Sequence, residues 1–188
     1  AWGLRALDLA DQLDDVEVRL HVMNTIGTIE LLGGDLAGRE KLARSIALAR
    51  EADLGEDVAR GYVHLAWASL RNRDHPAADA ALAAGLEYCG APRLDLWRLY
   101  LQSLQARSQL DQGRWTEAAD TASVVLGDAR TSSIPRINAG VVLALVRARR
   151  GDPGSADALG RARALSELAD ELQYVEAVAA AGAEVAWL

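Results

Sequence analysis

The sequence predicts an all-α fold, an α-α superhelix of about four antiparallel helix pairs that forms one domain over residues 1–188. The main observation is a turn that recurs along the chain. If Gly34, Arg73, Gly113 and Gly151 are equivalent, the steps between them are 39, 40 and 38 residues. Near-constant spacing of this kind is typical of helical repeat arrays. Composition agrees: 51% of the residues are hydrophobic, Phe is absent and only 4 residues are Pro, which favours helix.

The first half of the chain contains five segments with helical periodicity, expected over residues 1–13, 16–32, 36–49, 56–70 and 77–88. Asp14 and Asp15 supply N-cap chemistry for the second segment. Gly33 and Gly34 end that segment, because glycine accepts the left-handed conformation of a helix C-terminus. Pro76 suits the first turn of the fifth helix, where its missing N–H costs nothing.

The second half continues with helices over residues 94–110, 115–126, 136–150, 155–168 and 170–188. Trp115 directly follows the Gly113 turn, so we expect it to be a buried anchor between helices. The polar stretch 131–135 is the longest joint and the best candidate for a hinge. Arg147, Arg149 and Arg150 end one helix, where cations complement the negative end of the helix dipole.

Residues around the turns resemble a tetratricopeptide repeat (TPR), with its small residue, turn residue and second small residue. The matching sets are Ala106, Gly113, Trp115 and Ala118; Ala66, Arg73, Asp74 and Ala78; Ala144, Gly151, Asp152 and Ala156. In the first copy Gly27, Gly34 and Asp35 fit, but Arg39 occupies the second small-residue position. The steps also exceed the usual 34 residues of this repeat. The chain is similar to the divergent TPR region of large bacterial regulators of the LuxR type, the MalT-like ATPases. In those proteins an ATPase module precedes the repeats and a DNA-binding helix-turn-helix follows them, and the sequence contains neither.

The resemblance implies a concave face lined by the first helix of each pair, which in such arrays binds a partner. The inward-facing positions would be Asn24, Thr28, Arg60, Val63, Trp67, Arg71, Tyr100, Ser103, Arg107 and Asn138. From these we predict a binding site formed by Arg60, Trp67, Arg71, Tyr100, Arg107 and Asn138, because aromatic and arginine side chains dominate interface energetics. Arg71 and Arg107 could hold a carboxylate or phosphate through paired hydrogen bonds. The alternative is that Trp67 belongs to the core and the arginines only pair with nearby acids.

Several classes of function are disfavoured by the sequence. A net charge of −7 argues against nucleic acid as a direct partner, since phosphate binding needs a concentrated basic surface. The longest apolar run, residues 139–146, is far below the about 20 residues of a membrane-spanning helix. The single cysteine, Cys89, is compatible with a reducing compartment, and we expect a cytoplasmic protein. The histidines at 21, 64 and 75 share no metal-ligand spacing, no enzyme motif is present, and no cofactor is expected.

We therefore expect a non-catalytic module that binds a protein, a peptide or a small-molecule effector. By resemblance it would be the sensor or scaffold part of a bacterial, signal-responsive transcription regulator. The alternative is a self-association domain without a ligand site. The apolar residues of the two end segments, among them Trp2, Leu4, Leu7, Leu9, Val175, Val178, Val185, Trp187 and Leu188, would be uncovered in a fragment of a longer array. Such patches are expected to drive self-association.

Overall fold

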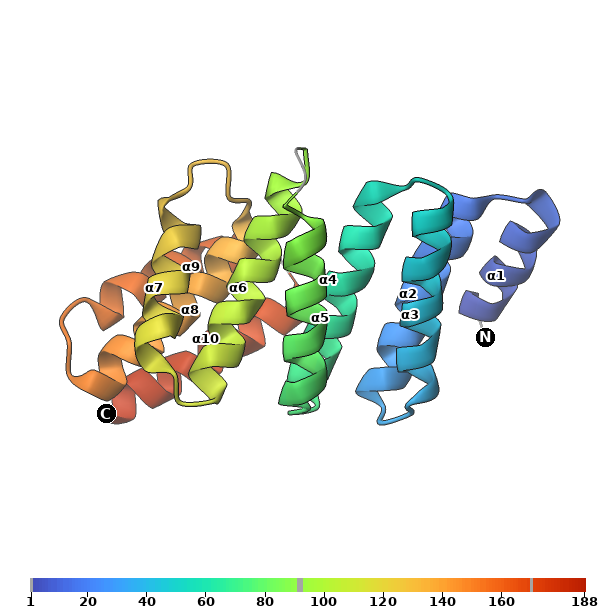
Figure 1. Ribbon diagram of the computed structural model, residues 1–188. Coiled ribbons are helices and arrows are strands. Elements are labelled where there is room, and N and C mark those ends of the chain that lie inside the picture. The colour runs from blue at the N-terminus through green and yellow to red at the C-terminus, as the bar shows by residue number, and fades with distance from the viewer. Residues whose placement is uncertain (1, 91–92, 170) are drawn as a thin grey trace. The chain divides into compact units, whose positions relative to one another are not determined.

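The computed structural model describes residues 2–90, 93–169 and 171–188 (Figure 1). In these ranges ten α-helices and no strand are present, which confirms the all-α prediction. The helices are α1 (Trp2–Leu13), α2 (Val16–Leu32), α3 (Ala37–Glu51), α4 (Gly55–Arg71), α5 (His75–Tyr88), α6 (Asp95–Asp111), α7 (Trp115–Gly127), α8 (Ser133–Arg150), α9 (Ser155–Ala169) and α10 (Leu172–Trp187). Residue 170, the expected first residue of the last helix, lies outside the described residues. The chain divides into two compact units, Ala1–Trp97 (unit 1) and Arg98–Leu188 (unit 2).

Unit 1 is built from successive helices that pack on their neighbours in the chain. α2 contacts α1, α3 and α4, while α4 also contacts α3 and α5. One part of the core consists of Leu20, Ile46, Ala49 and Val58. A second part, formed by Leu31, Leu42 and Ala68, lies further along α2. Because α4 packs on both helices of the preceding hairpin, unit 1 has the nearest-neighbour packing of a repeat-like helical protein.

Unit 2 is organised around α8, which contacts α7, α9 and α10. Every residue from Ala139 to Val146 is buried, because the helix is covered on all sides. That segment is the apolar run noted in the sequence, and it is too short to cross a membrane. Among the described residues no helix is both long and apolar enough to span a bilayer.

Most of the turns between the helices contain a residue in the left-handed conformation. The four residues taken as equivalent in the sequence all have positive φ: Gly34 (85°), Arg73 (58°), Gly113 (78°) and Gly151 (72°). Each lies in a short connection between two helices, at α2–α3, α4–α5, α6–α7 and α8–α9, which confirms the predicted turn positions. The other joints of the first half use the same region, at Asp14, Asp53 and Arg93. A left-handed residue ends a helix by redirecting the chain within one turn.

The first repeat copy differs from the register expected in the sequence. The small residue that packs on Gly27 is Gly38, not the residue at Arg39. A Cβ atom on Gly38 would lie 2.3 Å from the carbonyl oxygen of Gly27 and 2.4 Å from the amide nitrogen of Leu31. The α2 and α3 backbones therefore touch directly at this point. Arg39 is displaced to the side of the contact, where it donates a hydrogen bond to Asp74 over 2.5 Å.

The fourth copy also shifts. Ala156, expected at the second small-residue position, is exposed, and Ala158 is the buried residue. The reason is the longer α8–α9 connection, which has a second left-handed residue at Gly154. It delays the start of α9 to Ser155. In the second and third copies the expected pairs are all buried: Ala66 with Ala78, and Ala106 with Ala118.

Trp115, expected to be a buried anchor between helices, packs against the core but is only partly buried. Its ring packs against the core cluster of unit 2 on one side. On the other side the guanidinium of Arg149 lies 6.0 Å from the ring centre. Trp115 is the first residue of α7, and it lies between the core of unit 2 and the guanidinium of Arg149.

The polar joint between α7 and α8, which was expected to be a hinge, is held in place by hydrogen bonds. The guanidinium of Arg136 donates to three backbone carbonyls, those of Leu126, Asp128 and Thr131. The hydroxyl of Thr131 donates to the carbonyl of Val125 over 2.7 Å. These bonds satisfy the carbonyl groups that the end of α7 would otherwise leave unpaired, so the joint is held in one conformation.

Candidate functional site

Polar side chains from α2 and α4 meet on one face of unit 1. Asn24 and Thr28 lie one turn apart on α2, and both were predicted to face inward. The hydroxyl of Thr28 donates to the carbonyl of Asn24 over 2.6 Å and lies 3.0 Å from Nδ1 of His64 on α4. Because its single proton is already donated, Thr28 accepts from His64, whose ring therefore carries its proton on Nδ1. Burial, with the charges of Arg60 and His21 as smaller contributions, lowers the pKa of His64 to about 4.

The other predicted residues of unit 1 are dispersed along α4. Arg60 donates to Asp57 over 3.0 Å and stacks 5.5 Å from the ring centre of Trp97. Trp67 is partly buried against the Leu31–Leu42–Ala68 core, in agreement with the alternative that it is a core residue. Arg71 is exposed at the last residue of α4. The structure does not bring Trp67 and Arg71 together with Arg60, which lies two or more turns away on the same helix.

Unit 2 presents a second polar row, formed by α6, α8 and α10. The hydroxyls of Tyr100 on α6 and Tyr174 on α10 lie 3.0 Å apart. One turn along, the amide of Asn138 on α8 donates to the hydroxyl of Ser103 over 3.3 Å. Of the predicted site residues, Tyr100 and Asn138 thus lie on the same face of this unit, linked through Ser103, which donates to the carbonyl of Tyr100.

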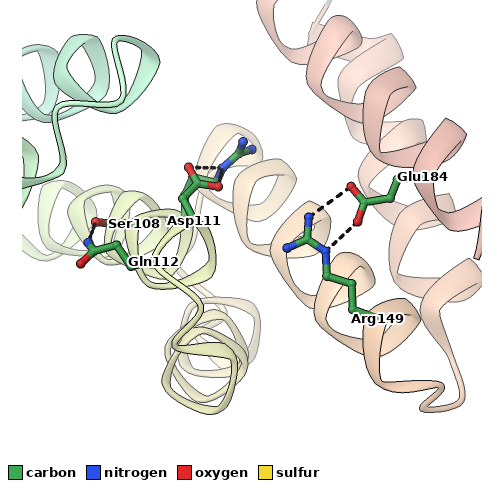
Figure 2. Close-up of polar contacts among 6 residues, drawn as sticks. Ser108, Asp111, Gln112, Arg149 and Glu184 are labelled. Atoms are coloured by element: carbon green, nitrogen blue, oxygen red, sulfur yellow. Dashed lines mark hydrogen bonds and ion pairs between the residues drawn. The ribbon is translucent and has the colours of Figure 1, made fainter.

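Two ion pairs form the far end of this row (Figure 2). Arg107 uses only its Nε, which donates to both carboxylate oxygens of Asp111 over 2.9 Å. Arg149 binds Glu184 of α10 through two nitrogens, at 2.6 and 3.1 Å. The two terminal nitrogens of Arg107 have no partner among the described residues, and its side chain is 44% exposed. Arg107 therefore retains both terminal nitrogens of its guanidinium as hydrogen-bond donors.

The electrostatics couple these two pairs. Hydrogen bonding to Arg149 lowers the pKa of Glu184, and the charges of Arg149 and Arg107 lower it further. Hydrogen bonding to Glu184 raises the pKa of Arg149, and Asp111 adds a smaller contribution. At the other end of the row, burial raises the pKa of Tyr100 well above its ordinary range, so its hydroxyl stays protonated. The row therefore offers a neutral hydroxyl pair at one end and alternating charges at the other.

The Arg149–Glu184 pair is expected to stabilise unit 2 in a pH-dependent way. The pKa of Glu184 is depressed from its ordinary value of 4.5 in the folded protein. The contribution is therefore complete above 4.5 and is lost as the pH falls through the lower folded value. We expect Glu184→Gln to reduce the free energy of unfolding at pH 7 and to lose this difference from wild type near pH 3. Urea titrations from pH 7 to pH 3 measure this difference in the free energy of unfolding. Glu117→Gln, at an exposed position of α7, is the control. A difference that stays constant down to pH 3 would contradict the pairing.

Sequence reasoning missed four residues of these two rows. Tyr174 and Glu184 lie on the last helix, where only the apolar stripe was recognised. Arg149 was assigned to the helix dipole, but it has a specific carboxylate partner. His64 was considered only as a metal ligand and rejected. The missing signal was long-range, since each of these contacts joins residues 35 to 74 positions apart.

No protein-family model, no curated protein and no solved structure matches the chain. The class of protein is therefore defined by the structure alone: an all-helical, repeat-like protein. In the described part of the chain no group of three or more His, Cys, Asp or Glu side chains could hold a metal ion.

Proposed function

We propose that this chain is a non-catalytic binding module, arranged as a TPR-like α-α superhelix and acting in the cytoplasm. Its role would be that of the sensor or scaffold section of a signal-responsive bacterial transcription regulator. The recurrent turns and the small residues buried at the helix crossings support the repeat arrangement. The observation that carries the binding role is the polar row of unit 2, in which Arg107 keeps two donors without partners on the face that also holds Tyr100 and Asn138.

This arrangement suits a ligand with an anionic group and an aromatic ring. Paired N–H donors of one guanidinium match the two oxygens of a carboxylate or phosphate. The hydroxyls of Tyr100 and Tyr174 and the amide of Asn138 would supply neutral hydrogen bonds further along the row. None of these groups forms the nucleophile and base pair that covalent catalysis requires, which favours binding over an enzymatic role.

Tryptophan fluorescence tests this proposal, because Trp115 lies beside Arg149 in the same unit. We expect phenyl phosphate or 4-hydroxybenzoate to quench the emission in a saturable way. Arg107→Ala should weaken binding about tenfold or more, since a hydrogen bond to a charged group contributes about 1.5–3 kcal/mol and about 1.4 kcal/mol is a factor of ten. Arg161→Ala, an exposed arginine on α9, is the matched control. Equal affinities in both variants, or no quenching by either compound, would refute the site.

Self-association is the second candidate function, and the apolar residues of the end helices favour it. On α1, Trp2 is 81% exposed and Leu4, Leu9 and Leu13 are exposed; on α10, Leu172, Val175 and Trp187 are exposed, Trp187 at 85%. Val178, expected in the same patch, is instead buried in unit 2. Exposed large apolar side chains of this kind are typical of contact sites. Light scattering over a dilution series distinguishes the two functions, because a self-association domain dissociates on dilution whether or not a ligand is present.

A further inference from the structure

The carboxylate of Glu184 holds Arg149 in the geometry that the carboxylate of a ligand would use. Its two oxygens accept from Nε and from one terminal nitrogen of Arg149, at 2.6 and 3.1 Å (Figure 2). Arginine commonly binds carboxylates and phosphates through paired hydrogen bonds of this kind. The two side chains come from α8 and α10 and are 29% and 35% exposed. A solute can therefore reach the pair from solvent.

The Arg149–Glu184 pair and the Arg107–Asp111 pair form one cluster of charges. The charge of Arg107 lowers the pKa of Glu184. The charge of Asp111 in turn raises the pKa of Arg149, so each pair lies within electrostatic range of the other. Asp111 uses only the Nε of Arg107, whose two terminal nitrogens have no partner among the described residues. The cluster thus contains one arginine with free donors and one whose donors are occupied by a carboxylate of the chain itself.

Two guanidinium groups in one cluster favour a ligand with more than one negative charge. A carboxylate that replaced Glu184 on Arg149 would exchange one single charge for another and would gain little. A phosphate monoester carries about −1.5 to −2 charges at pH 7 and has three acceptor oxygens. Such a group can accept hydrogen bonds from Arg149 and Arg107 together, which offsets the loss of the Glu184 contact.

We propose that Glu184 is an internal competitor at the anion site of unit 2. The ligand is an aryl phosphate monoester, which replaces the carboxylate of Glu184 on Arg149 and lies between Arg149 and Arg107. This role of Glu184 rests on the anion-binding function proposed above. It adds the charge class of the ligand and the contact that limits the affinity of the site.

Isothermal titration calorimetry of the whole chain with phenyl phosphate tests the role of Glu184. We expect Glu184→Gln to bind phenyl phosphate about tenfold more tightly than wild type, because Arg149 then gives up a neutral partner and not a charged one. Glu184 is partly exposed, so the variant should remain folded, which circular dichroism verifies. Glu167→Gln, at an exposed position of α9 in the same unit, removes the same charge and should bind as wild type does.

A second comparison separates the release of Arg149 from a general loss of negative charge. In an Arg149→Ala background, Glu184→Gln should give no gain in affinity, since the carboxylate has no guanidinium to occupy. Phenyl sulfate tests the charge class, because it has the same ring and three terminal oxygens but a single negative charge. We expect it to bind wild type about tenfold more weakly than phenyl phosphate does.

Each contrary result has a distinct meaning. Equal affinity of wild type and Glu184→Gln for phenyl phosphate would overturn the competitor role and leave the anion site of unit 2 in place. A gain that persists in the Arg149→Ala background would also overturn it, because diffuse electrostatics would then explain the gain. Phenyl sulfate that binds as tightly as phenyl phosphate would refute the charge class. No heat of binding at millimolar phenyl phosphate, in wild type and in Glu184→Gln alike, would refute the anion site together with the role of Glu184.

Discussion

Gly38→Ala is expected to lower the free energy of unfolding by about 3 kcal/mol or more, at the upper end of overpacking effects. The new methyl group would lie 2.3 Å from the carbonyl oxygen of Gly27 and 2.4 Å from the amide nitrogen of Leu31. Both atoms belong to the α2 backbone, so no side chain can rotate away to make room. The α2 and α3 helices would have to separate, and the contacts of Leu31 and Leu42 in the core beside them would weaken.

A glycine with free space around it provides the control. Gly160 lies inside α9, and a Cβ atom there would have no neighbour within 4 Å. Gly160→Ala should therefore stabilise the helix by about 0.5–1 kcal/mol, because alanine has the higher helix propensity. Circular dichroism during urea unfolding measures both variants. If Gly38→Ala is as stable as wild type, the direct backbone contact of α2 and α3 is wrong.

Trp115→Ala is expected to cost about 2–3 kcal/mol, less than the about 3–5 kcal/mol typical of fully buried aromatic residues. The ring packs on the core of unit 2 over part of its surface, so a cavity forms only on that side. The substitution also removes the ring beneath Arg149, a contribution of about 0.5–1 kcal/mol at a partly exposed site.

Trp187→Ala is the matched control, because Trp187 is 85% exposed and its removal should leave the denaturant midpoint nearly unchanged. Fluorescence and circular dichroism should give the same midpoint for each variant. An unchanged midpoint in Trp115→Ala would show that the ring does not support the α7–α8 contact.

The fold class and the turn positions could be predicted because they depend on local chemistry. Gly34, Gly113 and Gly151 mark left-handed turns, and Arg73 was placed by spacing although its side chain gave no signal. The helix contacts were predicted less well. The Gly27–Gly38 and Ala158 contacts lie one residue before and two residues after the positions that a constant spacing gives. A fixed repeat spacing therefore assigned Arg39 and Ala156 to positions that their neighbours occupy.

The polar rows were predicted only in part, for a different physical reason. Helical spacing placed Tyr100, Ser103 and Arg107 on one face, and Asn138 joins Ser103 there. Spacing cannot show which residue of another helix lies opposite, so Tyr174 and Glu184 were missed. Nor can it show burial: Trp67 was predicted as a site residue but packs against the core of unit 1. That the residues of the predicted site act together in binding stays a prediction.

The hydrogen bond from His64 to Thr28 has a spectroscopic consequence. Since Thr28 has already donated its own proton to Asn24, the imidazole is restricted to one tautomer as long as α2 and α4 stay in contact. The Nδ1 proton is shielded from solvent exchange by the same contact, so its ring resonance should persist in ¹⁵N–¹H spectra in which the exposed His21 loses its own. The Nδ1 proton of His64 is thus an intrinsic nuclear magnetic resonance probe of the contact between the α2–α3 and α4–α5 hairpins. Its disappearance would register the separation of α2 from α4 without any label or added probe.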